Sequence, residues 1–468
     1  DTFTFGASGS LAGAIDGGAG SDTLDLSAVT DPTTIDLEAG SATRTGGIAG
    51  FESFVANGAD ATLIGASNVN AWTVTGSGVG DVDGVAFSGF TDLTGGSGAD
   101  TFAFDDGAAV LGAVDGGGGG ADELDLSAFT GPIAVDVASG TATGTGGIAN
   151  FESFRGPGGA SASFAGPGGV AAWTIDGVDS GDVAGIDFSG FGTLVGGGGA
   201  DTFTFTAGSL AGDVLGGLGS DEIVGPGGAP IAWLIDAADG GTFDRIGGAF
   251  SSVESLVGGG ADDTFGFAAG GSLSGSLAGG AGTDTLDYGG FGAAVDVDLA
   301  SGDATAIAGG FAGLETLIGT GSASDTLRGA DDVNTWTLSG AGAGDVDGFA
   351  FSSIANLFGG SAGDTFDLTA GSITGDIDGG GGTDTLIAAN ASNIWNITGL
   401  DTGTVGGVGG TFSSLENLTG GSMDDAFVID AGAGVTGDID GRGGTDTVDF
   451  SAFASPVTVD LGGGTGTG

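Results

Sequence analysis

The residues with the clearest potential for chemistry are aspartates that follow glycine-rich turns. The segments GGAGSDTLD (17–25) and GGSGADTFA (95–103) share the pattern Gly-Gly-x-Gly-x-Asp. Glycine permits tight turns that bring backbone carbonyl groups close together, and the aspartate adds a carboxylate. Such oxygens are the ligands that Ca²⁺ prefers, but the ion takes about six to eight of them. The pattern therefore predicts calcium sites that each need more than one turn.

These aspartates occur in pairs with a nearly constant spacing of about 20 residues, which is in the range of solenoid repeats. If that spacing is one coil of a repeating β-structure, the two turns of a pair lie about 4.8 Å apart on one edge. A shared Ca²⁺ would then remove the repulsion between the two carboxylates. The predicted pairs are Asp1 and Asp22, Asp100 and Asp122, Asp201 and Asp221, Asp263 and Asp284, Asp364 and Asp384, and Asp425 and Asp446. The glycines predicted to supply further ligands are Gly17, Gly18, Gly20, Gly95, Gly96, Gly98, Gly117, Gly118 and Gly120.

Several turns depart from the pattern. An additional aspartate precedes some turns, at Asp16, Asp115, Asp378 and Asp440, and other residues replace a glycine at Ala261, Ala362, Met423 and Arg442. Aspartate in a turn also caps backbone N–H groups without any metal. The sequence leaves both interpretations open: calcium sites with partial occupancy, or corners capped by protein alone.

The turns are similar to the nonapeptide GGxGxDxUx, where U is apolar, of the repeats-in-toxin or haemolysin-type calcium-binding family. In that family the nonapeptides build a parallel β-roll with Ca²⁺ between stacked turns. Segments such as NAWTVTG (70–76) and LENLTGG (415–421) resemble parts of very large bacterial surface and adhesin-type proteins with β-solenoid repeats. The resemblance implies a secreted or surface location and bound Ca²⁺. The chain departs from the family because its nonapeptides do not follow one another in tandem.

Composition excludes several classes of function. The chain has 61 acidic and 5 basic residues, a net charge of −56, no His and no Cys. Nucleic-acid binding is excluded because it needs a basic surface. Zinc sites, disulfides, thiol chemistry and His-based triads lack their residues. No apolar run approaches the roughly 20 residues of a membrane span, so we expect no membrane insertion.

Internal repetition organises the chain. Asp-Thr-Phe recurs at intervals of about 100 or 61 residues. We predict one continuous solenoid over 1–468, in which each coil contacts its neighbours. Its repeats span 1–99, 100–200, 201–262, 263–363, 364–424 and, as a partial repeat, 425–468. The two repeat classes differ by a block near 22–59, which we interpret as a whole number of coils of about 20 residues each.

The elements that must position these turns are short strands. In DTFTF (1–5) the side chains of Phe3 and Phe5 point to one face and those of Thr2 and Thr4 to the other. Glycine accounts for 111 of 468 residues, which suits frequent turns, and no stretch shows sustained helical periodicity. We predict an all-β, elongated, parallel and right-handed β-solenoid. The first phenylalanine of each complete repeat should be internal: Phe3, Phe102, Phe203, Phe265 and Phe366.

One tryptophan occurs in each complete repeat, at Trp72, Trp173, Trp233, Trp336 and Trp395. Tryptophans in a row could stack on sugars, but apolar residues at alternate positions favour internal packing. We predict a non-catalytic structural segment of a secreted, calcium-stabilised surface fibre or filament, joined to copies of itself or to flanking repeats. The alternative is an adhesin module that contacts surface glycans along one face. The chain begins and ends within a repeat, so we expect it to be part of a longer secreted polypeptide.

Overall fold

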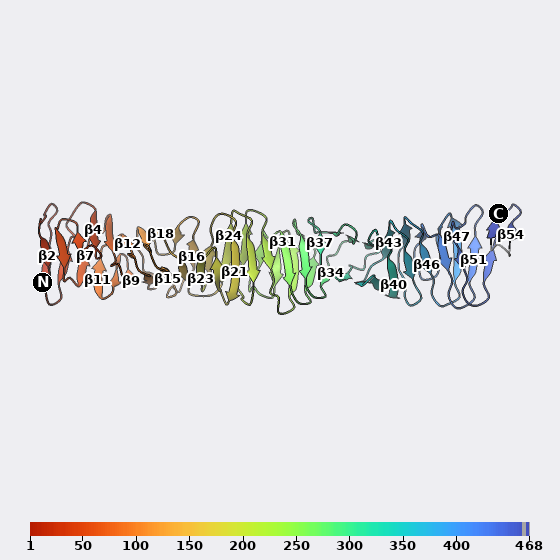
Figure 1. The fold of residues 1–468 in the computed structure, drawn as a ribbon, viewed down its shortest axis with the longest axis horizontal. Coiled ribbons are helices and arrows are strands. Elements are labelled where there is room, and N and C mark those ends of the chain that lie inside the picture. Colours follow the sequence, from red (N-terminus) through yellow and green to blue (C-terminus); the bar gives the residue numbers. More distant parts are fainter. Residues whose placement is uncertain (461–464, 468) are drawn as a thin grey trace. The chain divides into compact units, whose positions relative to one another are not determined.

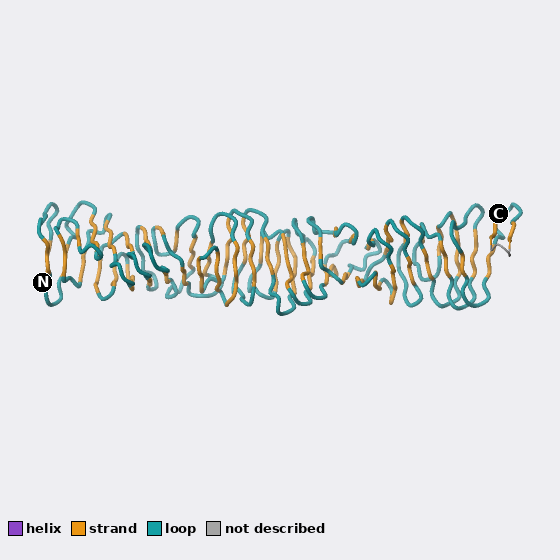
Figure 2. The backbone as a smooth tube through the Cα atoms, in the orientation of Figure 1, coloured by secondary structure: helices purple, strands orange, loops and turns teal. Residues whose placement is uncertain are grey.

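The computed structural model describes residues 1–460 and 465–467, and strands and turns make up this part of the chain. Strands account for 47% of the residues and helices for none; Figure 2 shows the short strands and the loops that join them. The described residues include no helix that could cross a membrane. The predicted all-β class is confirmed, because the strands form long, mainly parallel ladders of the kind found in β-solenoids.

The chain divides into two compact units. Unit 1 consists of Asp1–Val224 and Asp244–Val253, and unit 2 consists of Gly225–Phe243 and Glu254–Gly468. Within each unit the strands lie side by side in sequence order, apart from local reversals (Figure 1). Each unit contains two ladders, and the chain alternates between them.

Unit 1 has 14 strands on each ladder, and the second ladder is interrupted at two places into three separate sheets. The first ladder contains, in spatial order, β1 (Thr2–Thr4), β3 (Thr23–Asp25), β7 (Ser53–Val55), β11 (Val85–Ser88), β10 (Val79–Val82), β9 (Ala71–Gly76), β13 (Thr101–Phe104), β15 (Glu123–Asp125), β19 (Ser153–Arg155), β23 (Ile186–Ser189), β22 (Ser180–Val183), β21 (Ala172–Gly177), β25 (Thr202–Phe205) and β27 (Glu222–Val224). The second contains β2 (Ala14–Asp16), β6 (Gly47–Ala49), β5 (Ser41–Ala42), β4 (Thr33–Asp36), β8 (Ala61–Ile64), β12 (Asp92–Thr94), β14 (Ala113–Asp115), β18 (Gly147–Ala149), β17 (Thr141–Ala142), β16 (Ile133–Asp136), β20 (Ala162–Ala165), β24 (Thr193–Gly197), β26 (Val214–Gly217) and β30 (Phe250–Ser251).

Unit 2 repeats this arrangement. One ladder contains β29 (Gly240–Phe243), β28 (Ala232–Ala237), β32 (Thr264–Ala268), β34 (Thr285–Gly290), β38 (Thr316–Ile318), β42 (Phe349–Ser352), β41 (Ala343–Val346), β40 (Thr335–Gly340), β44 (Thr365–Asp367), β46 (Thr385–Ile387), β50 (Asn417–Thr419) and β52 (Ile439–Asp440). The other contains β31 (Ser255–Gly259), β33 (Leu277–Gly280), β37 (Phe311–Ala312), β36 (Asp303–Ala304), β35 (Asp296–Asp298), β39 (Thr326–Arg328), β43 (Asn356–Gly360), β45 (Ile377–Gly380), β49 (Phe412–Ser413), β48 (Thr402–Thr404), β47 (Ile394–Gly399), β51 (Ala426–Ile429) and β53 (Thr447–Asp449). The last two strands, β54 (Thr458–Asp460) and β55 (Thr465–Thr467), form a hairpin.

The prediction of a uniform coil length is wrong. Where one coil contains no antiparallel strand, residues that lie side by side in neighbouring parallel strands are about 20 positions apart in the sequence. Examples are Thr2 beside Thr23 and Thr202 beside Glu222. The separation is much larger where the coil contains a meander of three strands whose first two pair antiparallel, as for Thr23 beside Ser53 and Val214 beside Phe250. The additional residues form the meander, which folds back along one ladder.

The meanders also overturn the interpretation of the block near 22–59 as a whole number of coils. A long repeat has one meander on each ladder, so β1, β13 and β25, which begin successive repeats, share one ladder. A short repeat has one meander in total. In unit 2 the short repeat that starts at β44 is therefore followed by β51 on the opposite ladder. Within the block, β3, the meander β4–β6 and β7 lie on alternating ladders, which amounts to one and a half coils.

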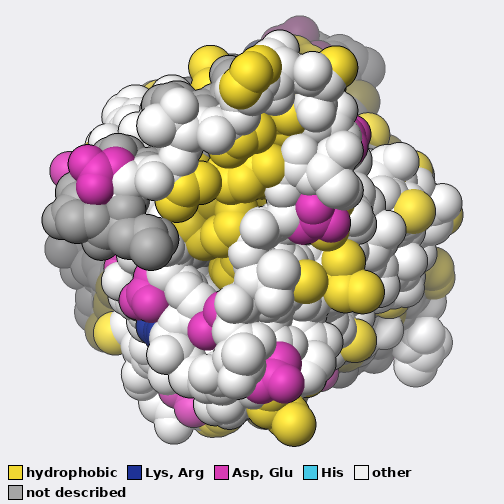
Figure 3. All heavy atoms as spheres, turned by 90° about the vertical axis from the view of Figure 1, so that its right-hand side faces the viewer, with side chains coloured by type: hydrophobic (Ala, Val, Ile, Leu, Met, Phe, Trp, Pro, Cys, Tyr) yellow, Lys and Arg dark blue, Asp and Glu magenta, His cyan; other side chains and the backbone are white. Residues whose placement is uncertain are grey.

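The core between the ladders contains the predicted aromatic residues. Phe102, Phe203, Phe265 and Phe366 are fully buried, and each of the five tryptophans is at most 2% exposed. The packing interpretation of the tryptophans is confirmed, because a sugar cannot reach a buried indole. Phe3 is the exception to the predicted set, since it is only partly buried. Figure 3 views the molecule from the right-hand end of Figure 1. Hydrophobic side chains gather at the centre of this view, and acidic side chains lie around them.

Candidate functional site: the aspartate column

The structure places the two aspartates of every predicted pair directly before neighbouring strands. Thr101 lies beside Glu123 in the ladder, which places the preceding residues, Asp100 and Asp122, in adjacent rows. Ten of the twelve aspartates are at most 2% exposed, whereas Asp1 and Asp446 are exposed. The prediction that the regular spacing within a pair marks adjacent turns is therefore confirmed.

A backbone N–H group connects the members of each internal pair. The N–H of Asp100 donates to Oδ1 of Asp122 at 2.7 Å. The same bond occurs in the pairs that begin at Asp201, Asp263, Asp364 and Asp425, at 2.6 to 2.9 Å. In the first pair the amino group of Asp1 donates to Oδ1 of Asp22. These contacts match the capping interpretation, in which the carboxylate accepts a backbone hydrogen bond from the previous row.

The pairs belong to longer columns of polar residues, which we call aspartate columns. In unit 1 the N–H of Asn70 donates to Asp100, and the N–H of Asp122 donates to Oε2 of Glu152. The column therefore runs Asn70, Asp100, Asp122, Glu152 over four consecutive rows. Each member stands two residues before a buried core residue of its strand. The column satisfies N–H groups at the strand starts, where the ladder itself offers no acceptor.

The first glycine of the motif is needed for close packing. A methyl group on Gly95 would lie 2.4 Å from Oδ2 of Asp100 and 2.1 Å from the carbonyl oxygen of Gly116. Any side chain there would push the carboxylate out of its buried position. The equivalent residue in the next turn is Gly116, whose added methyl carbon would lie 2.7 Å from Cβ of Asp122. The glycine that packs against the aspartate in that turn is therefore Gly116, one residue before the predicted Gly117, because the run of glycines there is longer; the ligand role of Gly117, Gly118 and Gly120 stays a prediction.

The other glycines have different roles. Gly18, Gly96 and Gly117 have positive φ angles of 92°, 130° and 99°, which disfavour any residue with a Cβ atom. The additional aspartates cap these turns. Asp115 Oδ1 accepts the N–H of Gly117, and equivalent bonds involve Asp16, Asp378 and Asp440. Gly118 faces open space, so nothing in the structure requires a glycine there.

The second oxygen of most column aspartates has no hydrogen-bond partner. Oδ2 is buried and unbonded in Asp22, Asp100, Asp201, Asp263, Asp284, Asp364 and Asp384. Burial raises the pKa of Asp263 to about 6, and the charges of Asp284 and Asp262 add to this rise. Burial likewise raises the pKa of Asp384 to about 6. A bound proton or cation would therefore stabilise the buried carboxylates at these corners.

The donor chemistry of the pairs suits calcium. An unbonded carboxylate oxygen is the hard ligand that Ca²⁺ takes, and adjacent rows supply one such oxygen each at Asp263 and Asp284. However, no group of three or more acidic residues that could hold a metal ion occurs among residues 1–460 and 465–467. The remaining ligands of an ion at these pairs would be backbone carbonyl oxygens and water. Calcium binding stays a prediction.

Several column members are absent from the predicted site. They are the glutamates Glu52, Glu152, Glu315 and Glu416, the asparagines Asn70, Asn334 and Asn393, and Asp325. A simple signal would have found them, because each precedes a buried core residue by two positions, as Glu152 precedes Phe154. A search based on glycine turns misses them, since the glutamates lack that turn.

Comparison with protein-family models and with curated proteins finds no match to this chain. The similarity to haemolysin-type repeats consequently rests on the nonapeptide pattern alone.

Proposed function

We propose that this chain is a structural, non-catalytic segment of an extracellular or cell-surface filament. In this proposal the β-solenoid supplies length and stiffness, and it is joined to flanking repeats or to other copies. The extracellular location is what the resemblance to bacterial surface proteins implies.

The observation that supports this function best is the uniformity of the aspartate columns. Five internal corners contain the same carboxylate-to-backbone bond, and the row before each of these pairs contributes a further N–H group. The most distinctive polar residues of every repeat thus hold neighbouring coils together. A chain built this way has equivalent structural joints along its length.

Calcium is proposed to stabilise the folded chain. The resemblance implies it, and the buried unbonded Oδ2 atoms and the net charge of −56 support it. Neutralising part of this charge would reduce self-repulsion within the folded chain. The ion would act on stability and stiffness, since the proposed function includes no catalytic step.

Immunogold electron microscopy of the producing cells tests the structural function. Antibodies raised against the whole chain should label thin unbranched fibres at the cell surface, at regular intervals along each fibre. A preparation treated with protease from outside should lose the label. Label confined to the cell interior, or to material without fibres, would refute the proposal.

A second candidate function is adhesion to glycans, which rows of outward-facing threonines favour. In unit 2, Thr264, Thr285 and Thr316 lie side by side on β32, β34 and β38. Thr335, Thr365 and Thr385 form a second row on the same ladder. Binding of the whole chain to a glycan array should fall on Thr285→Glu and persist on Thr4→Glu, since Thr4 is outside such a row. Absence of glycan binding by the unmodified chain would eliminate this function.

A further inference from the structure

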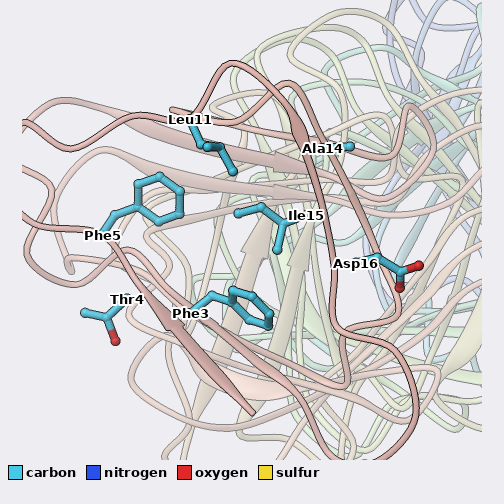
Figure 4. A pocket seen from close by; sticks show the side chains of 7 residues that line it. All are labelled: Phe3, Thr4, Phe5, Leu11, Ala14, Ile15 and Asp16. Atoms are coloured by element: carbon cyan, nitrogen blue, oxygen red, sulfur yellow. The ribbon is translucent and has the colours of Figure 1, made fainter.

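Two open hollows of the molecule have opposite linings. In unit 1, apolar side chains converge on a hollow of about 400 Å³ (Figure 4): Phe3, Phe5, Leu11 and Ile15. The polar residues beside it, Thr4 and Asp16, point away (Figure 4). In unit 2, a hollow of about 350 Å³ is lined by charged and polar residues together with one aromatic ring. We call it the unit 2 hollow, and its mixed lining is typical of sites for polar ligands.

The unit 2 hollow lies against the outer side chains of β35, β39 and β43. Asp298, Arg328 and Phe358 lie side by side on these strands. The equivalent rows of the other two long repeats contain neither an arginine nor an aromatic ring: Asp136, Ala165 and Val195 in one, and Asp36, Ile64 and Thr94 in the other. The same fold therefore forms without Arg328 and Phe358, so a role beyond the fold accounts better for this pair.

Asp296 and Phe358 hold the guanidinium of Arg328 in place. Its Nε donates to Oδ1 of Asp296 at 3.1 Å, and its Nη2 donates to Oδ2 at 3.4 Å. Its central carbon lies over the ring of Phe358, 5.0 Å from the ring centroid. Arginine has five N–H donors, so these two bonds leave three without a partner among residues 1–460 and 465–467. A guanidinium fixed in this way offers donors to a ligand at a low cost in side-chain entropy.

Acceptors and an apolar surface adjoin these donors. Asp298 lines the hollow and accepts the N–H groups of Ala300 and Ser301 through Oδ1. Its Oδ2 has no donor in the part of the chain that the structure describes. The Phe358 side chain is half-buried and lines the same hollow. Free donors, a free acceptor and part of an aromatic ring thus face one open space.

The charges around the hollow disfavour an ionic ligand. Asp296 compensates the charge of Arg328, while Asp298 and Asp331 also line the hollow or its rim. A phosphate, a sulfate or a uronate would therefore meet repulsion, which the net charge of −56 increases. The fixed guanidinium beside these carboxylates opposes a metal ion in the same way. The remaining class is a neutral ligand rich in hydrogen-bonding groups.

We propose that the unit 2 hollow binds a neutral pyranose unit of a glycan. Hydroxyl groups both donate and accept hydrogen bonds, so they match the free donors of Arg328 and the free oxygen of Asp298. The C–H face of a pyranose ring is apolar and packs on the exposed part of Phe358. The hollow is open, so it admits a unit within a longer glycan as well as a terminal one.

This inference goes beyond the proposed structural function and does not depend on it. It also assigns a place different from the threonine rows, which lie on the opposite ladder of unit 2. Fibres that bind no sugar would leave the structural function standing, and sugar binding by a chain that forms no fibres would leave this inference standing. The two experiments therefore fail separately.

Isothermal titration calorimetry of the whole chain tests the site with three neutral hexasaccharides: cellohexaose, maltohexaose and mannohexaose. At least one should bind with a Kd of about 1 mM or lower. Phe358→Ala should weaken this binding about tenfold, because the stacking surface is lost. Val195→Ala is the matched control, since Val195 has the equivalent, half-buried position in unit 1, and it should leave the binding unchanged.

Arg328→Lys tests the donors without removing the charge. Lysine lacks the planar fork that pairs with Asp296, so binding should again fall about tenfold. Equal binding by this variant and the unmodified chain would overturn the proposal, even if Phe358→Ala disturbed β43. So would no binding of any of the three sugars at about 10 mM, tighter binding of hexagalacturonate than of all three, or loss of binding on Thr285→Glu, which alters the opposite ladder.

Discussion

Two corners of unit 2 contain equally buried aspartates with opposite hydrogen bonding. Asp263 uses Oδ1 for the N–H of Ile231, while its Oδ2 has no partner. Asp325 is fully buried as well, but both of its oxygens are bonded. They accept the N–H groups of Val295 and Ser322 and the hydroxyl of Thr320.

The residue five positions before the aspartate accounts for this difference. It is Gly258 for Asp263 and Thr320 for Asp325. The glycine packs against Oδ2 and donates nothing, whereas the threonine donates its hydroxyl group. The glycine motif therefore keeps a carboxylate oxygen buried and unbonded. A corner that only needed a cap could satisfy both oxygens with protein donors, as Asp325 does.

The largest expected effect comes from filling the space that the glycine leaves. A methyl group on Gly258 would lie 2.4 Å from both Oδ2 of Asp263 and the carbonyl oxygen of Gly279. Gly258→Ala should destabilise this corner by about 3 kcal/mol, as overpacking does. Hydrogen exchange at β32 measures the local opening free energy. Gly227→Ala is the control, because an added methyl group there meets nothing within 4 Å. Equal effects of the two substitutions would contradict the packing role.

A smaller effect is expected when the aspartate of each corner is replaced by asparagine. Asp325→Asn places an NH₂ group among donors and should cost about 2 kcal/mol, because buried donors lose their acceptor. Asp263→Asn should cost less than about 0.5 kcal/mol or stabilise, since the amide oxygen can still accept the N–H of Ile231 and the NH₂ group replaces an oxygen that has no hydrogen-bond partner. Urea denaturation monitored by hydrogen exchange at each corner gives both values. A larger destabilisation by Asp263→Asn than by Asp325→Asn would contradict this difference between the two corners.

The strand pattern and the pairing of aspartates were predictable from the sequence because both depend on local spacing. Alternation in DTFTF identifies the inward side chains, and the separation of Asp100 from Asp122 identifies adjacent rows. The meanders were not predictable in this way. The chain between Ala71 and Ser88 reverses twice and returns to pair with β7, and short antiparallel strands have the same alternation as parallel ones.

Calcium should act selectively at corners with an unbonded oxygen. We expect millimolar Ca²⁺ to raise the melting temperature of the whole chain by several degrees more than Mg²⁺, which is a poorer fit to all-protein sites. Asp263→Asn should reduce this difference, and Asp325→Asn should leave it unchanged. Differential scanning calorimetry after chelation and readdition of each ion provides the measurement. Identical responses to Ca²⁺ and Mg²⁺ would favour capping by protein alone.

The stability should fall as the pH rises from 5 to 7, because the buried column aspartates have raised pKa values. In the absence of divalent ions, burial raises the pKa of Asp263 from 3.8 to about 6, so the folded chain binds more protons than the unfolded chain between these values. This contribution to stability is fully present below pH 3.8 and is lost as the pH rises through about 6. The melting temperature in chelator should therefore be higher at pH 5 than at pH 7. Asp263→Asn combined with Asp384→Asn should flatten the profile, and a steeper profile in that variant would refute the assignment.

The roles of individual glycines were only partly predictable for a related reason. The pattern identifies the turn, but a run such as Gly116–Gly120 contains five identical residues. Only the contacts of Gly116 with Asp122 determine which glycine begins the turn. The glycine pattern also identifies too few members of each column. Asparagine and glutamate occupy rows of the column as well as aspartate, although their side chains differ in length and polarity.

The smallest expected effect concerns the backbone conformation of a turn and not its carboxylate. Arg442 stands where other turns have their second glycine, and its φ angle is 58°. A residue with a Cβ atom is disfavoured by about 1 kcal/mol in this region. Arg442→Gly should therefore stabilise the corner at Asp446 by up to about 1 kcal/mol, whereas Arg442→Ala, which retains the Cβ atom, should not. Hydrogen exchange at β53 distinguishes them. If both substitutions stabilise equally, the gain comes from removing the arginine side chain, and the second glycine of the motif serves packing between rows more than backbone conformation.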